Sequence, residues 1–114
     1  MAEHFVAAGP KTCQWGFFDA ASAPVTRVKS GDIVVMDTVS GNPNFLPPTN
    51  KYTIPPALLD IHRNVRQGPG PHILTGPVYI EGAEPGDVLE VKIEDVCITT
   101  DWGLNRFRPL AGTL

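Results

Sequence analysis

Proline and glycine constrain the fold of this sequence more than any other feature. Twelve prolines and eleven glycines make up about a fifth of its 114 residues, whereas the two types together account for about 12% of an average protein. Proline removes a backbone donor and glycine is flexible, so both disfavour long helices. Because the prolines separate Val- and Ile-rich runs, the pattern predicts a mainly β fold, with short strands and tight turns forming a sandwich or barrel-like sheet.

The expected strands lie where apolar residues alternate with polar ones or run together. They cover residues 4–8, 25–28, 33–39, 78–80, 88–93 and 96–98. One short helix is expected at 55–65, because Leu58, Ile61 and Val65 recur at helical spacing and proline suits the first helical turn. Residues 42–54 contain three prolines and three asparagines and are expected to form a long loop.

Residues 75–93 combine two apolar strands with a rigid turn and several carboxylates. The turn is Glu84-Pro85-Gly86-Asp87, and a similar turn, Lys29-Ser30-Gly31-Asp32, precedes the strand expected at 33–39. In each turn the glycine can supply a positive φ and the aspartate can accept a backbone N–H. Local turn chemistry explains the similarity of these two segments, and duplication of a strand unit is the alternative.

Charge and hydropathy exclude two classes of partner. Twelve acids and nine bases give a net charge of -3, and the arginines are scattered, so we expect no nucleic-acid partner. No apolar run approaches the roughly 20 residues that cross a bilayer, and the N-terminus lacks a signal peptide, so we expect no membrane partner and a cytoplasmic location. The two cysteines, Cys13 and Cys97, are expected to be reduced, with Cys97 buried in a strand.

Glu81 and Glu84 follow the strand expected at 78–80 and are the first candidates for chemistry. A carboxylate held at a strand end can bind a metal ion, act as a general base or orient a ligand. A solvated turn is the alternative interpretation. His72 could reach the end of the sheet near Glu81, although its spacing from His62 matches no helical metal-binding motif.

Three aromatic residues, Trp15, Phe17 and Phe18, surround Gly16. We expect them in the core, because each removes a large apolar area from water when buried. The alternative for Trp15 is a place in the wall of a small pocket. Gly16 permits a close approach of another backbone segment or a bulge.

Five motifs, at residues 15–19, 28–32, 70–77, 81–89 and 105–112, form a recognisable set. Through them the chain resembles the acetamidase/formamidase family over essentially all 114 residues. Members of the family are much longer, so residues 1–114 are interpreted as the incomplete, β-rich N-terminal part of such an enzyme. The resemblance implies hydrolysis of linear amides, formamide or acetamide, to ammonia and the carboxylate by a homo-oligomer.

The resemblance also leads to a hypothesis about the site. Amide hydrolysis needs an activated water or nucleophile, a stabilised oxyanion and a protonated leaving amine, and a divalent metal ion, zinc or calcium, can supply the first two. In this hypothesis Glu81 is the catalytic carboxylate, His72 and Asp37 are metal ligands, and Trp15 shapes the pocket for the small amide substrate. The family's His- and Asp-rich segments lie outside residues 1–114, so we expect little activity from this chain alone. The alternative is a non-catalytic β-rich module for assembly or small-ligand binding.

Overall fold

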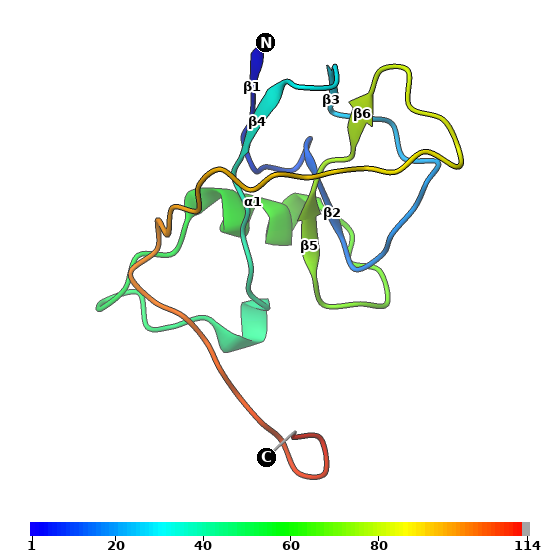
Figure 1. The fold of residues 1–114 in the computed structure, drawn as a ribbon. Helices are drawn as coiled ribbons and strands as arrows, with labels where there is room; N and C mark the ends of the chain where they lie inside the picture. Colours follow the sequence, from blue (N-terminus) through cyan, green and yellow to red (C-terminus); the bar gives the residue numbers. More distant parts are fainter. Residues whose placement is uncertain (113–114) are drawn as a thin grey trace.

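The computed structural model describes residues 1–112, and the regular secondary structure in this part of the chain consists mainly of short strands (Figure 1). One α-helix, α1 (Pro56–Asn64), and one 3₁₀ turn, η1 (Pro43–Phe45), lie between the fourth and fifth strands. The prediction of a mainly β fold with one short helix is confirmed. The strands are β1 (Glu3–Val6), β2 (Cys13–Trp15), β3 (Thr26–Val28), β4 (Ile33–Met36), β5 (Ile73–Thr75) and β6 (Val78–Ile80).

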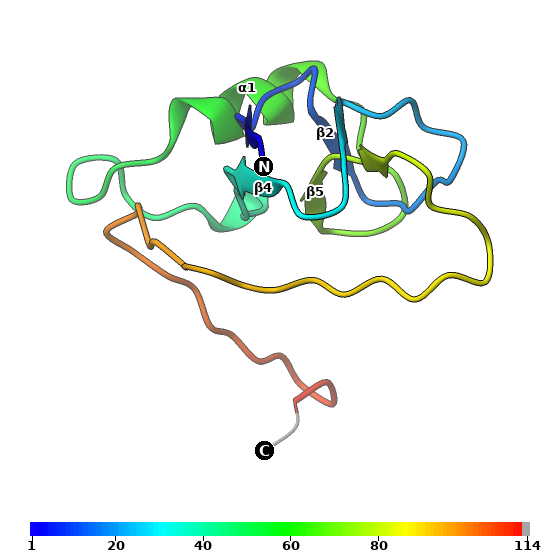
Figure 2. The ribbon, with the colours of Figure 1, turned by 45° about the horizontal axis from the view of Figure 1, so that its top comes forward.

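The strands pair two by two, and the resulting sheets are small and not closed. β1 pairs with β4 and β3 with β6 in parallel, whereas β2 and β5 are antiparallel. Figure 2 shows α1 on one side of the strands and the chain that follows β6 running along the other side. No helix within residues 1–112 is long and apolar enough to cross a bilayer.

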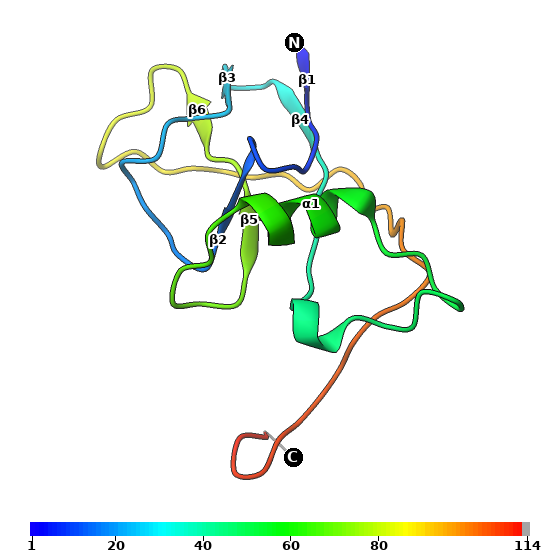
Figure 3. The same cartoon turned by 180° about the vertical axis from the view of Figure 1, so that it is seen from behind.

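The core lies where α1 packs against the β2–β5 ladder. Cys13, Trp15 and Ile61 form a buried cluster, and the partly buried Val65 and Ile73 pack against it. Figure 3 shows the helix lying across β2 and β5 when the molecule is seen from behind. The helix therefore supplies the apolar cover of β2 and β5.

The helix forms as its sequence predicts. Pro56 occupies the first turn, where the backbone N–H has no partner within the helix, so its absence costs no hydrogen bond. At the other end, the Val65 N–H donates to the Ile61 carbonyl at 2.9 Å. Leu58 and Ile61 are fully buried, and Val65 is half-buried. The expected helical spacing thus marks the face that contacts the core.

Gly16 brings two backbone segments into close contact. The Gly16 N–H donates to the His72 carbonyl and the Gly16 carbonyl accepts from the Gly70 N–H, both at 2.8 Å. A Cβ at Gly16 would overlap the Gly70 carbonyl oxygen and lie 3.0 Å from Gly68 backbone atoms, and its φ of +89° is unfavourable for other residues. The expected close approach is confirmed.

The chain turns away from the core immediately after Trp15. Trp15 is 4% exposed, but Phe18 is 88% exposed and Phe17 is 41% exposed. The expectation of a three-residue aromatic core is therefore confirmed for Trp15 and wrong for the two phenylalanines. The positive φ at Gly16 ends β2 and directs the following residues outward.

The two Gly-Asp turns have the same geometry. In the first, the Asp32 N–H donates to the Lys29 carbonyl at 3.0 Å and the Asp32 carboxylate accepts from the Lys29 N–H at 2.9 Å. Asp87 and Glu84 make the same two bonds at the same two distances. Both glycines have positive φ, so the predicted turn chemistry is confirmed at both places.

The strands expected at 88–93 and 96–98 are wrong. Residues 87–100 have no regular secondary structure, and Val88, Val91 and Val96 are largely exposed. Cys97 is also exposed, contrary to the expected buried thiol. An alternating sequence shows which residues suit a half-buried strand, but a strand also needs a neighbouring backbone, and none of the described strands pairs with this segment.

Candidate functional site

A polar groove lies beside Glu81, where the ends of two parallel ladders meet. Its volume is about 400 Å³. The Glu81 N–H donates to the Val28 carbonyl at 2.8 Å, which fixes Glu81 just beyond the β3–β6 ladder. The groove is lined by Met1, Ala2, His4, Arg27, Val28, Lys29, Asp32 and Glu81.

His4 and Asp32 form a side-chain pair in this groove. His4 Nε2 lies 2.9 Å from Asp32 Oδ2, and the two side chains are 25% and 9% exposed. The other carboxylate oxygen, Oδ1, accepts from the Ala2 N–H at 3.0 Å. The Lys29 N–H also donates to Oδ2, so three residues, Ala2, His4 and Lys29, converge on one carboxylate.

These donors keep Asp32 ionised. The backbone N–H groups of Ala2 and Lys29, followed by the His4 side chain, hold the pKa of Asp32 far below its ordinary value. An ionised carboxylate only accepts hydrogen bonds, so the proton between the pair belongs to His4 Nε2. In the neutral imidazole this leaves Nδ1 as an acceptor.

The remaining charged side chains of the groove have opposite signs. The Arg27 guanidinium carbon lies 4.2 Å from the centre of the Tyr79 ring, across the β3–β6 ladder. Lys29 and Glu81 are exposed. The groove therefore offers cationic donors, a free carboxylate and an oriented histidine to a small polar ligand.

Trp15 lines neither this groove nor a second cavity, which lies between β2 and the segment that follows α1. Its Nε1 donates to the Pro71 carbonyl at 3.2 Å, and its ring centre lies 5.0 Å from that of His62. His62 Nε2 in turn lies 2.8 Å from the Gly41 carbonyl oxygen. The indole thus ties β2 to the segment before β5, and its contact with a substrate stays a prediction.

Asp37 and His72 lie near opposite ends of β5. The Thr75 hydroxyl donates to the Asp37 carbonyl at 2.7 Å, while the His72 carbonyl accepts from the Gly16 N–H. Both residues are exposed. Within residues 1–112 no three His, Cys, Asp or Glu side chains lie close enough to hold a metal ion. The described part of the chain does not by itself bring Asp37, His72 and Glu81 together as a ligand set.

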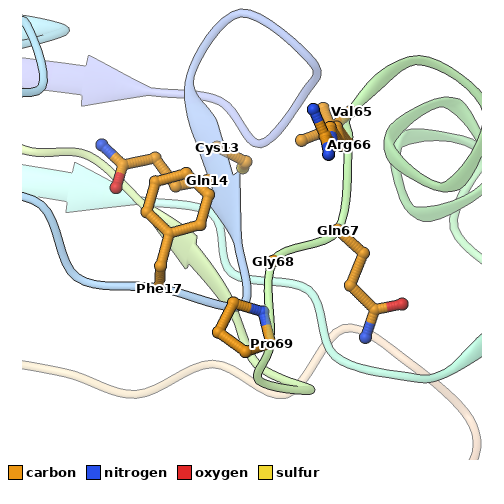
Figure 4. Close-up of a pocket in the computed structure, with 8 residues that line it drawn as sticks. All are labelled: Cys13, Gln14, Phe17, Val65, Arg66, Gln67, Gly68 and Pro69. Atoms are coloured by element: carbon orange, nitrogen blue, oxygen red, sulfur yellow. The ribbon is translucent and has the colours of Figure 1, made fainter.

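A second cavity, of about 670 Å³, lies between β2 and the segment that follows α1 (Figure 4). Cys13 is its one sulfur-bearing side chain, with Sγ 3.5 Å from the Thr75 hydroxyl and 3.9 Å from the Thr12 hydroxyl. These two hydroxyl groups are the side-chain hydrogen-bond partners of the thiol. The cavity is lined by Cys13, Gln14, Phe17, Val65, Arg66, Gln67, Gly68 and Pro69.

The sequence predicted Glu81 as a candidate site residue but did not predict the His4–Asp32 pair. Asp32 was expected to act only as a turn residue, and His4 only as part of the first strand. The Gly31-Asp32 turn is a signal for an aspartate that accepts backbone N–H groups. The contact with His4, however, follows from the parallel pairing of β1 with β4, which no local pattern predicts.

The fold and groove define a mainly β domain with a charged, partly hydrogen-bonded site at the ends of its strands. The chain belongs to the Acetamidase/Formamidase family, whose sequence pattern matches residues 22–110. A formamidase from Methylophilus methylotrophus is 53% identical over 36 residues, which are 30% of this chain and 9% of the formamidase. The chain therefore matches only a small part of that relative's length. No solved structure matches the chain.

Proposed function

We propose that the complete protein containing this chain hydrolyses short aliphatic amides, formamide or acetamide, to ammonia and the carboxylate. The match of the Acetamidase/Formamidase family to residues 22–110 carries this proposal. The short similarity to a formamidase supports a small substrate. The groove beside Glu81 adds the polar groups that an amide would need.

In this proposal Glu81 is the general base. It takes a proton from a water molecule as the water oxygen bonds to the amide carbon, and an oxyanion forms. Arg27 and Lys29, the cations that line the groove, stabilise that negative charge in this proposal. The C–N bond then breaks, the departing nitrogen takes up the proton, and the products are ammonia and a carboxylic acid that ionises.

His4 has a positioning role in the same groove. Asp32 holds its Nε2 side, so Nδ1 is the ring atom left to accept a hydrogen bond from an amide N–H. A metal centre that includes His72 and Asp37 remains a prediction for the complete protein. No step above depends on a metal ion, because the described residues do not assemble three ligands.

The test is a pair of substitutions in the complete enzyme. Glu81→Gln removes the base and keeps the shape, so kcat should fall by a factor on the order of 10² to 10⁴. Glu84→Gln is the matched control, because only the backbone of Glu84 takes part in the turn, and it should leave kcat unchanged. Near-normal ammonia release by a folded Glu81→Gln enzyme would remove Glu81 from the mechanism.

A second candidate is a non-catalytic module for assembly or small-ligand binding. The exposed apolar residues between 88 and 98 favour assembly, because apolar side chains exposed together in one segment are typical of an interaction site. Ammonia release from formamide by the complete protein, and its loss in Glu81→Gln, would distinguish the amidase from this module.

A further inference from the structure

The outer face of the β3–β6 ladder carries charged side chains of the groove. Arg27 and Tyr79 are direct partners in the parallel register, and both are exposed, whereas Val28 beside Arg27 is buried. The Glu81 N–H continues the ladder by its bond to the Val28 carbonyl. Because side chains alternate along a strand, Glu81 lies on the same face as Tyr79 and Arg27. The proposed general base and one of its two cations are thus both neighbours of Tyr79.

The Tyr79 ring holds the Arg27 guanidinium. The guanidinium carbon lies 4.2 Å from the ring centre, within the distance at which the negative face of an aromatic ring attracts a cation. This attraction uses the charge of the guanidinium, so its N–H donors remain available to a ligand in the groove that Arg27 lines. The contact therefore orders a long, exposed side chain without consuming its donors.

The same contact keeps Arg27 apart from Glu81. The strand spacing and the rise per residue put the Cα atoms of these diagonal neighbours on the order of 8 Å apart, a separation that an arginine side chain can bridge. Within residues 1–112, however, no side-chain ion pair joins them, and the guanidinium lies over Tyr79 instead. An Arg27–Glu81 ion pair would occupy both the carboxylate and the N–H donors, so it would remove the base and the cation from the reaction together.

We propose that Tyr79 is a positioning residue of the amidase site, which holds the Arg27 guanidinium at the groove wall and keeps it from pairing with Glu81. This role rests on the proposed amide hydrolysis and belongs to a residue that does not itself line the groove. The Arg27 donors then serve the oxyanion that forms as water adds to the amide, while the Glu81 carboxylate stays free to take the proton. Tyr79 thus acts on kcat through Arg27, by its ring and not by its hydroxyl group.

Two substitutions in the complete enzyme separate the ring from the hydroxyl group. Tyr79→Leu removes the ring, so kcat for formamide should fall by about 2- to 30-fold, the range that corresponds to a cation–π contact. KM should change little, because the oxyanion develops only in the transition state. Tyr79→Phe keeps the ring and should hold kcat within about twofold of the wild-type value. Tyr52→Leu is the matched control, because Tyr52 is 40% exposed against 43% for Tyr79 and lies outside the groove, and it should leave kcat unchanged.

Rescue by free guanidinium provides a second readout. Arg27→Ala should lower kcat by a factor on the order of 10² to 10³. Guanidinium chloride, added far below the concentrations that unfold proteins, should restore part of this activity, because the ion can occupy the vacated place over the Tyr79 ring. Arg27→Ala/Tyr79→Phe should also be rescued, and Arg27→Ala/Tyr79→Leu much less. A merely structural role of Tyr79 would not make the rescue depend on the ring.

The role of Tyr79 and the proposed function fail in different ways. Full kcat in both Arg27→Ala and Glu81→Gln would remove the groove from amide hydrolysis and would overturn both. A loss in Arg27→Ala, together with an unchanged kcat in folded Tyr79→Leu, would overturn only the role of Tyr79. Tyr79→Phe as impaired as Tyr79→Leu, or equal rescue with and without the ring, would also overturn it. Urea unfolding checks that each variant is folded, and Tyr79→Thr, whose β-branched side chain suits a strand, replaces Tyr79→Leu in both tests where the latter does not fold.

Discussion

Asp32 holds the ring of His4 by a 2.9 Å contact between Oδ2 and Nε2, across an interval of 28 residues in the sequence. The parallel pairing of β1 with β4 makes this contact, since His4 lies on β1 and Asp32 immediately precedes β4. The same carboxylate also closes the turn by accepting the Lys29 N–H. One side chain thus links a local turn to a tertiary contact.

Asp32 should make the stability of the chain depend on pH. Its pKa is lower in the folded chain than its ordinary value of 3.8, so its stabilising contribution is fully present above that value and is lost as the pH falls below it. The wild-type chain should therefore exceed Asp32→Asn in the free energy of unfolding at neutral pH, and the difference should shrink in acid. Urea unfolding of both proteins across this range measures it. A difference that is constant with pH would contradict the assigned role of the carboxylate.

Gly16→Ala should destabilise the fold by more than about 1 kcal/mol, because the new methyl group meets the Gly70 carbonyl oxygen and the backbone φ is positive. Gly9→Ala is the matched control, since no atom lies within 4 Å of the added Cβ. Thermal or urea unfolding compares the two. Equal stability of the two variants would show that the contact with residues 68–70 does not restrict Gly16.

Trp15→Ala should cost about 3–5 kcal/mol, the range for removal of a buried large aromatic side chain. Trp15→Phe keeps much of the packing but leaves the Pro71 carbonyl without its donor, so it should cost less. Phe18→Ala should change the free energy of unfolding by less than about 0.5 kcal/mol, because that side chain is largely exposed. Equilibrium unfolding ranks the three variants, and a larger loss for Phe18→Ala than for Trp15→Ala would overturn this description of the core.

Residues 1–114 alone should release no appreciable ammonia from formamide. The similarity to the formamidase covers 9% of that protein, so we expect the active centre to need groups from outside this chain. An ammonia assay on the purified chain, compared with the complete enzyme at equal molar concentration, is the measurement. Substantial turnover by the chain alone would show that the groove beside Glu81 suffices.

Local patterns predicted the local structure well. The spacing of Leu58, Ile61 and Val65 identified α1, because helical periodicity depends only on neighbours within two turns. The Gly-Asp pairs identified both tight turns for the same reason. The positive φ at Gly16, which directs Phe17 and Phe18 outward, depends on contacts with residues 68–72 and was therefore not predicted.

The non-local features were harder to predict. Residues 88–93 alternate as clearly as a real strand does, but alternation does not supply a neighbouring backbone. The contact between His4 and Asp32 required the pairing of β1 with β4, and Glu81 reached the same groove through the pairing of β3 with β6. The sequence therefore predicted one of the acids that line this groove but not the His4–Asp32 pair beside it.

The order of the ladders has a consequence for how this chain folds during synthesis. Each of the three ladders joins a strand from residues 1–28 to a strand from residues 33–80, in the order β1–β4, β2–β5 and β3–β6. The first three strands therefore leave the ribosome without partners, and only β1 can pair when β4 emerges. The other two must wait for α1 and the strands after it. Such pairings over long sequence distances fold slowly, and a single backbone cut between β3 and β4 would separate the partners of every ladder at once.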